Sequence, residues 1–206
     1  MCGRYVVKKP VTKTNKLIKS VIQIEDTENY NAHPYQRLPV IKKYKNGNTL
    51  ENLQWGLVPK WAKDKNFKAL INARLETIDE KISFKKLIKN NRCVAVADGF
   101  YEWKRKEKEK TPHYFIRPDS KTIFFAAIFD GDQFCLITEE AKNKIKEIHH
   151  RQPVILNQND VNSYLNIELQ GSAFLNNRKV PDLIFHKVSK DVNKPTNNNA
   201  SLLQPI

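Results

Sequence analysis

The middle of the chain carries four apolar runs that are rich in β-branched and aromatic residues. They are CVAVADGFYEW (93–103), HYFIRP (113–118), TIFFAAIFD (122–130) and QFCLIT (133–138). Runs of this length and composition, bounded by polar or turn-forming residues, are typical of β-strands. The charged stretch KRKEKEK (104–110) lies between the first two runs and is interpreted as a solvated hairpin connection rather than a binding tract. The centre of the chain is therefore expected to form a β-sheet.

Helical patterns are expected on both sides of this centre. Apolar residues recur at helical spacing in three segments, which cover residues 12–23, 77–90 and 139–150. Further strands are expected at 48–59, 153–156 and 183–189, a loop and short strand at 30–41, and a loop-like end from 197. Clustered strands flanked by helices favour an α+β fold with a largely antiparallel, barrel-like β core. With no repeat or linker in 206 residues, one domain spanning 1–206 is expected.

The balance of charge limits the classes of partner. Lysine and arginine total 36 against 22 aspartate and glutamate residues, which gives a net charge of +14. Such an excess favours a polyanionic partner such as nucleic acid, although solubility alone also accounts for it. No apolar run is long enough to cross a bilayer, and no secretory pattern opens the sequence. We therefore expect no membrane partner and a cytoplasmic, nucleoid-associated location.

The three cysteines, Cys2, Cys93 and Cys135, are widely spaced and form no CxxC pair. Their number and spacing argue against a disulfide framework and a zinc site, so no metal is expected. Cys93 and Cys135 lie within apolar strand-like runs and are interpreted as inert core thiols. Cys2 is left as the cysteine whose position requires another explanation.

Four short stretches place polar, titratable residues beside apolar segments. They are MCGRY (Cys2, Arg4), INARLET (Asn72, Arg74, Glu76), GFYEWK (Glu102) and IHHRQPVIL (His149, Arg151). Each stretch alone has an ordinary explanation, because carboxylates are mostly exposed and histidines often end helices. The adjacent pair His149–His150 lacks the spacing of a helical metal site. The isolated histidines, His33, His113 and His186, are interpreted as structural.

Taken together, these stretches resemble the SRAP domain family, the SOS response-associated peptidases also described as abasic-site processing proteins. The resemblance runs through MCGRY, YNAHP, WGLVPKW, INARLET, ADGFYEWK, AAIFD, LITEEA, IHHRQPVIL, HKVSKDVN and LLQPI. It implies that Met1 is removed and that the protein binds abasic sites in single-stranded DNA. Separately, we expect a monomer and no cofactor. The residues that match the family's active site are Cys2, Asn72, Glu102 and His149. Those that match its DNA-contacting positions are Arg4, Trp61, Arg74, Thr138 and Arg151.

The chemistry of an abasic sugar explains why an exposed amino-terminal cysteine is useful. An α-amine with a pKa near 7.8 is about 10% neutral at pH 7, whereas a typical lysine is below about 0.1% neutral. The neutral amine attacks the ring-opened aldehyde to form an imine, and the Cys2 thiol closes on that imine to form a thiazolidine. Glu102 is expected to act as general acid and base, His149 to assist sugar-ring opening, and Asn72 to orient the reacting groups.

The same sequence leaves other activities open. The imine also permits β-elimination, so a lyase side activity is expected, and Glu102 is expected to help reverse the link. An alternative is a cysteine peptidase of the N-terminal-nucleophile type, which uses Cys2 with its own amine as base. A further alternative is a non-catalytic single-stranded DNA-binding module, which predicts steep salt dependence and no preference for a lesion.

Overall fold

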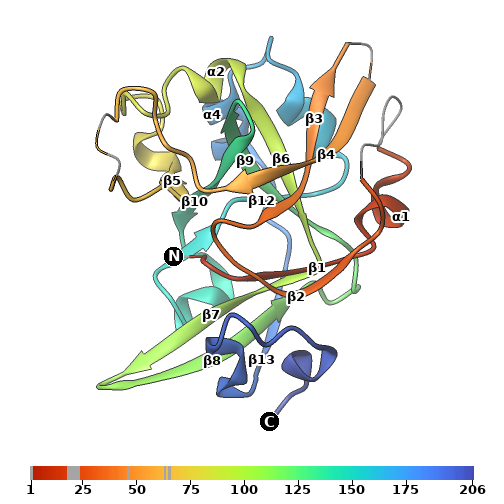
Figure 1. The fold of residues 1–206 in the computed structure, drawn as a ribbon, viewed down its shortest axis with the longest axis vertical. Coiled ribbons are helices and arrows are strands. Elements are labelled where there is room, and N and C mark those ends of the chain that lie inside the picture. Colours follow the sequence, from red (N-terminus) through yellow and green to blue (C-terminus); the bar gives the residue numbers. More distant parts are fainter. Residues whose placement is uncertain (1, 18–23, 46, 63, 65) are drawn as a thin grey trace.

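The structure is a computed structural model that describes residues 2–17, 24–45, 47–62, 64 and 66–206. Two β-sheets pack against each other, and short helices cover one of them (Figure 1). The first sheet has five antiparallel strands in the order β13 (Ile184–Lys187), β8 (Glu109–Ile116), β7 (Gly99–Lys106), β1 (Tyr5–Lys8) and β2 (Glu28–Ala32). Strands β7 and β8 form the hairpin expected around KRKEKEK, with strand continuing to Lys106 and resuming at Glu109.

The second sheet curls into a ring. Its strand order is β11 (Arg151–Pro153), β10 (Gln133–Glu140), β4 (Gly47–Trp55), β3 (Arg37–Tyr44), β6 (Arg92–Ala97), β9 (Ile123–Asp130) and β12 (Ile155–Leu156). Strand β10 also pairs with β9, which brings the ends of the path together. The pairing is antiparallel except where β10 runs parallel to β4 and to β5 (Asn72–Arg74). The expected α+β fold with a largely antiparallel, barrel-like core is confirmed, in the form of a ring-like sheet rather than a true barrel.

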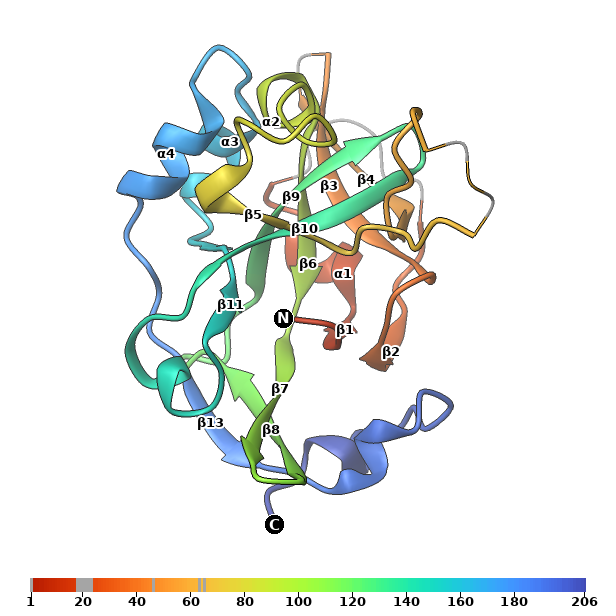
Figure 2. The ribbon, with the colours of Figure 1, turned by 90° about the vertical axis from the view of Figure 1, so that its left-hand side faces the viewer.

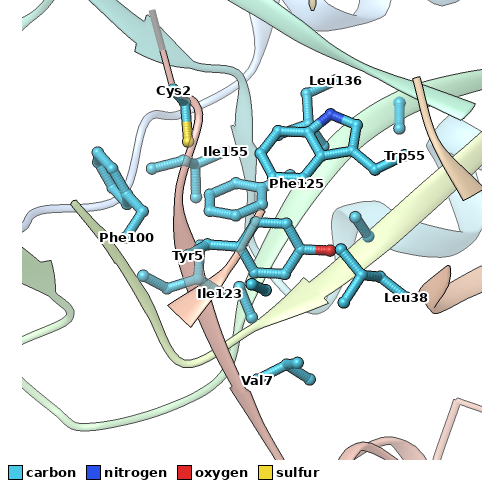
Figure 3. Packing of buried hydrophobic residues seen from close by; sticks show 14 of the residues in the cluster. Cys2, Tyr5, Val7, Leu38, Trp55, Phe100, Ile123, Phe125, Leu136 and Ile155 are labelled. Atoms are coloured by element: carbon cyan, nitrogen blue, oxygen red, sulfur yellow. The ribbon is translucent and has the colours of Figure 1, made fainter. Parts of the chain in front are cut away.

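Aromatic side chains fill the space between the two sheets (Figure 3). The rings of Phe100 and Phe115 stack with centroids 5.0 Å apart, and Tyr5 lies 5.1 Å from Trp55. The alternate residues of β6, β9 and β10 face the opposite way and form a second cluster. Helices α3 (Asp160–Leu165) and α4 (Gly171–Asn177) contribute Tyr164 and other residues to it. Because both faces of this sheet are buried, its strands read as nearly continuous apolar runs.

Cys93 and Cys135 are fully buried, as expected for core thiols. Within the described residues, no helix is long and apolar enough to cross a membrane.

Several local expectations are corrected by the structure. The helix expected at 77–90 is absent: a 3-10 turn covers Leu75–Thr77 and only α2 (Leu87–Asn90) is α-helical. Its apolar residues do not share one face, because Ile78 is buried whereas Ile82 is 73% exposed. The helix expected at 139–150 is a 3-10 helix over Asn143–Glu147, since β10 continues to Glu140.

Corrections also apply near both ends of the chain. Helix α1 covers Pro10–Thr14, and residues 18–23 of the helix expected at 12–23 lie outside the described residues. Residues Glu28–Ala32, of which 30–32 were expected to be loop, form β2, which pairs along β1. The strand expected to run to Pro59 ends at Trp55. The expected C-terminal loop contains a 3-10 helix at Ala200–Leu203, which buries Leu202 against the first sheet.

Candidate functional site

Cys2 lies just before β1, at the meeting point of the two sheets. Figure 2 shows the start of β1 in the middle of the molecule, between the β10–β11 pair and the β7–β8 hairpin. The Cys2 side chain is fully buried, and its sulfur is directed into the core near Phe100 and Ile155 (Figure 3). Burial raises the pKa of the Cys2 thiol well above its ordinary value, with a further rise from the charge of Glu102. The sulfur is therefore held as a neutral thiol close to Glu102.

Asn72 contacts Cys2 from the second sheet. Strand β5 pairs in parallel with β10, which places Asn72 opposite Leu136 and beside the start of β1. The Asn72 side-chain Nδ2 donates a hydrogen bond of 3.1 Å to the carbonyl oxygen of Cys2. Its Oδ1 is buried and accepts no hydrogen bond from the described residues. The amide therefore fixes the backbone at position 2 and keeps an acceptor beside it.

Glu102 reaches the same region from the first sheet. The backbone N–H of Tyr101 donates to the carbonyl oxygen of Arg4, so Glu102 on β7 comes level with the start of the chain. Only 2% of Glu102 is exposed. Burial raises the pKa of its carboxyl group to about 7, although the backbone N–H of Trp103 donates to it and opposes the rise. Near neutral pH this group exchanges protons readily, as a general acid and base must.

His149 follows the 3-10 helix at Asn143–Glu147 and precedes β11. Its Nδ1 lies 3.0 Å from the backbone nitrogen of Arg151 and 3.1 Å from the Arg151 carbonyl oxygen, so it accepts from the N–H in one tautomer and donates to the carbonyl oxygen in the other. Burial lowers the pKa of His149 to about 4. The ring is therefore neutral at pH 7, with one nitrogen that donates a hydrogen bond and one that accepts.

Glu102 and His149 share a cavity of about 440 Å³. The cavity is lined by Arg4, Glu102, Trp103, Arg105, Lys110, His149 and Asn193. The last turn of the 3-10 helix at Lys190–Asn193 closes one side, where the indole Nε1 of Trp103 donates to Asn193 at 2.7 Å. The four catalytic candidates are thus brought together, with Cys2 and Asn72 at the buried end of the group and Glu102 and His149 in the cavity.

Trp103 was expected beside Glu102, whereas the cavity residues Arg105, Lys110 and Asn193 were not predicted as site residues from the sequence. Arg105 and Lys110 belong to the stretch interpreted as a solvated connection, and two of its side chains instead line the cavity. A signal was available for Arg105, because β-strand alternation places it on the same face as Trp103. Asn193 ends HKVSKDVN, one of the stretches that carry the family resemblance, but no role was expected for it.

The five expected DNA-contacting residues lie in different settings. Arg4 lines the cavity, and its Nη1 donates to Asn31 and to the carbonyl oxygen of Val192. Arg74 is exposed on β5, two residues after Asn72 and on the same face of the strand. Trp61 is 54% exposed in the segment that follows β4, packs edge-on against Phe67 and does not line the cavity.

Thr138 and Arg151 are buried and contact each other. The Arg151 guanidinium forms two hydrogen bonds with the Glu76 carboxylate, at 2.7 and 3.0 Å, and a third with the Thr138 carbonyl oxygen. These contacts tie β11 to β10 and to the turn after β5. In this structure the Arg151 guanidinium is engaged within the protein by Glu76 and Thr138.

Comparisons with known proteins agree with this architecture. The family model described as SOS response associated peptidase (SRAP) matches residues 1–195. The abasic site processing protein YoaM of Bacillus subtilis is 36% identical over 189 residues, which cover 84% of this chain and 83% of that protein. The abasic site processing protein YedK of Escherichia coli is 31% identical over 225 residues, and the match covers the full length of both proteins.

A solved structure shows the same fold. The crystal structure of a protein from Bacteroides thetaiotaomicron superposes with a TM-score of 0.82 at 22% identity, with both chains covered completely. The match to the family model over most of the sequence, together with relatives above 30% identity along nearly all of the chain, shows that this protein belongs to the SRAP family.

Proposed function

We propose that this protein processes abasic sites in single-stranded DNA by forming a covalent bond to them through Cys2, after Met1 has been removed. Relatives across the full length of the chain carry the name abasic site processing protein, which supports the class of substrate. The observation that carries the proposal is that Asn72 and Glu102 lie beside residue 2, with His149 in the same cavity as Glu102. A net charge of +14 suits a nucleic-acid partner.

The reaction has two bond-forming steps. The α-amine of Cys2 adds to the aldehyde carbon of the ring-opened sugar, and loss of the sugar oxygen as water gives an imine. The Cys2 sulfur then adds to the imine carbon, and its proton passes to the nitrogen, which closes a five-membered thiazolidine. Because both nucleophiles belong to one residue, ring closure is intramolecular and has a high effective concentration.

The surrounding residues donate and accept the protons that these two steps require. Glu102, with a pKa of about 7, protonates the departing oxygen and accepts a proton when the amine attacks. The neutral imidazole of His149, which lines the same cavity, assists opening of the sugar ring. The unsatisfied Oδ1 of Asn72 is suited to accept a hydrogen bond from the amine of Cys2, which orients its lone pair toward the sugar.

Three accompanying activities belong to the same proposal. Hydrolysis of the Met1–Cys2 peptide bond by the protein itself exposes the amine. The imine permits β-elimination of the 3′ phosphate, a lyase activity that thiazolidine closure suppresses by consuming the imine. Proton transfer from Glu102 to the ring nitrogen assists reversal of the link. The stable link shields the lesion during the response to DNA damage, in a monomeric protein that acts at the nucleoid.

The test is incubation with single-stranded DNA that contains one abasic site, followed by a denaturing gel and intact mass. We expect a heat-stable adduct with the mass of the Met1-processed chain plus DNA minus one water. Cys2→Ala should form no such adduct, whereas the matched variant Cys135→Ala, also at a buried cysteine, should retain it. An adduct of equal yield from Cys2→Ala, or an adduct that retains Met1, contradicts the proposal.

Lesion-free DNA distinguishes the proposal from its alternatives. Equal affinity for lesion-free and abasic DNA, with no adduct, indicates a non-catalytic binding module. Cleavage of added peptides without any aldehyde indicates a peptidase.

A further inference from the structure

Two basic side chains face each other across the β7–β8 hairpin beside the candidate site. Arg105 on β7 pairs directly with Lys110 on β8, and both line the cavity that contains Glu102 and His149. Figure 1 shows the hairpin projecting from the body of the molecule on the side where the chain begins. The two cations therefore border the cavity where the hairpin leaves the protein.

This pairing is unfavourable without a ligand. Like charges directly opposite each other on neighbouring antiparallel strands destabilise the pair. The next cross-strand pair of the same hairpin is balanced, since Lys106 faces Glu109, and Glu109 also pairs with Lys190 at 3.0 Å. Among the described residues, neither Arg105 nor Lys110 has a carboxylate within salt-bridge distance. An anion bound between them relieves this repulsion.

The position is close to the reacting groups. The positive charge of Arg105 contributes to the electrostatics of both Glu102 and His149, after the larger effect of burial on each pKa. An anion held by Arg105 therefore lies near the point where an abasic sugar meets these residues. In single-stranded DNA the anions on either side of any sugar are its own flanking phosphates. A guanidinium and an ammonium group bind the several acceptor oxygens of a phosphate well.

We propose that Arg105 and Lys110 together bind one of the two phosphates that flank the abasic sugar and so position the lesion in the cavity. The inference rests on the proposed function, because it concerns the substrate of the same site. It assigns a specific DNA contact to the hairpin that none of the five sequence-predicted contacts supplies.

The test uses single-stranded DNA with one tetrahydrofuran abasic analogue, which has no aldehyde and therefore reports binding alone. Uncharged methylphosphonate replaces each flanking phosphate in turn. We compare the parent protein with Arg105→Gln/Lys110→Gln. The matched control is Lys104→Gln/Lys106→Gln, which removes two positive charges from the same hairpin at positions that do not line the cavity.

For the parent, we expect one of the two methylphosphonates to weaken binding about tenfold, as for loss of a charge-assisted contact. Arg105→Gln/Lys110→Gln should bind unmodified DNA about tenfold more weakly and show no further loss with that methylphosphonate. Its plot of log affinity against log salt should be shallower by about 0.7, the value for one phosphate on a single strand. The control variant should keep the full methylphosphonate effect.

The inference is overturned if Arg105→Gln/Lys110→Gln keeps the methylphosphonate effect, or if the control variant loses it equally. Far-ultraviolet circular dichroism and melting temperature verify that both variants are folded. Adduct formation by the parent on true abasic DNA is measured in parallel. An adduct with no phosphate effect rejects this inference alone, whereas a phosphate effect without any adduct rejects the covalent chemistry alone.

Discussion

The side-chain amide of Asn72 donates a 3.1 Å hydrogen bond to the carbonyl oxygen of Cys2. This contact joins two residues 70 positions apart in the sequence and links the two sheets at the point where the chain begins. Because β5 is held by β10 on the other side, the position of residue 2 depends on the ring-like sheet as well as on β1. The candidate nucleophile is thus fixed by a rigid neighbour rather than by a loop.

Replacing Asn72 with aspartate tests this contact. Asn72→Asp has nearly the same size, but places an acceptor against the Cys2 carbonyl oxygen and leaves a charge at a buried position. We expect adduct formation on abasic DNA to slow by roughly tenfold or more, measured as the initial rate on denaturing gels. Asn176→Asp, at an exposed position of α4, is the control and should react like the parent. An unchanged rate for Asn72→Asp removes Asn72 from the mechanism.

The buried acid Glu102 gives a pH-dependent prediction for stability. Its pKa rises from an ordinary value of 4.5 to about 7 because burial disfavours the charged form. The stability that the protonated acid contributes is complete below pH 4.5 and is lost as the pH rises through 7. Glu102→Gln should therefore unfold at about the same denaturant concentration as the parent at pH 5. At pH 8.5 it should be more stable by about 1–3 kcal/mol.

Chemical denaturation at the two pH values measures this difference. Glu107→Gln, in the exposed turn of the same hairpin, should show none. If the difference in unfolding free energy between Glu102→Gln and the parent is the same at both pH values, the pKa of Glu102 is not raised.

The ion pair between Glu76 and Arg151 predicts a structural effect at a position expected to contact DNA. Desolvation raises the pKa of Glu76, but the hydrogen bonds from Arg151 outweigh it and lower the pKa overall. Glu76→Gln leaves the buried Arg151 without a carboxylate, and because the Glu76 side chain is 46% exposed and screened by water, it should cost about 0.5–1 kcal/mol at pH 7.

Because the pKa of Glu76 is lowered on folding, the stability from this pair is present above pH 4.5 and falls as Glu76 is protonated. The difference in melting temperature between Glu76→Gln and the parent should therefore become smaller at acidic pH, as measured by thermal unfolding. Glu80→Gln, at an exposed position four residues later, serves as control. A Glu76→Gln protein as stable as the parent at pH 7 shows that the pair contributes nothing.

The exposed ring of Trp61 is expected to matter for DNA rather than for stability. Trp61 contacts Phe67 edge-on and leaves half of its surface available for a base. Trp61→Ala should weaken single-stranded DNA binding by about 5- to 150-fold, the range for loss of one stacked base. Its melting temperature should stay within a few degrees of the parent. Tyr44→Ala, at an exposed aromatic residue near the β3–β4 turn, should bind DNA normally. Equal losses in the two variants argue against a specific stacking role.

The central strands and their hairpin were predictable from sequence because they depend on local pattern. Runs such as TIFFAAIFD fill both faces of a strand, and the β7–β8 connection lies within one charged stretch. The helix expected at 77–90 failed for a related reason. Its apolar residues have helical spacing, but only Ile78 and Phe84 are buried in the core, whereas Ile82 is exposed. The segment between them forms turns instead of a helix.

By itself, the sequence determined the strand-rich α+β class, the basic charge and the motif residues around Cys2, since strand composition and residue identity are local properties. Only the tertiary structure decided that Asn72 contacts Cys2, that Arg151 is bound by Glu76, and that Arg105 and Lys110 border the cavity. These relationships depend on the parallel pairing of β5 with β10 and on the closure of β10 against β9. Such pairings join distant segments through the combined burial of both sheets, and no periodicity within one segment encodes them.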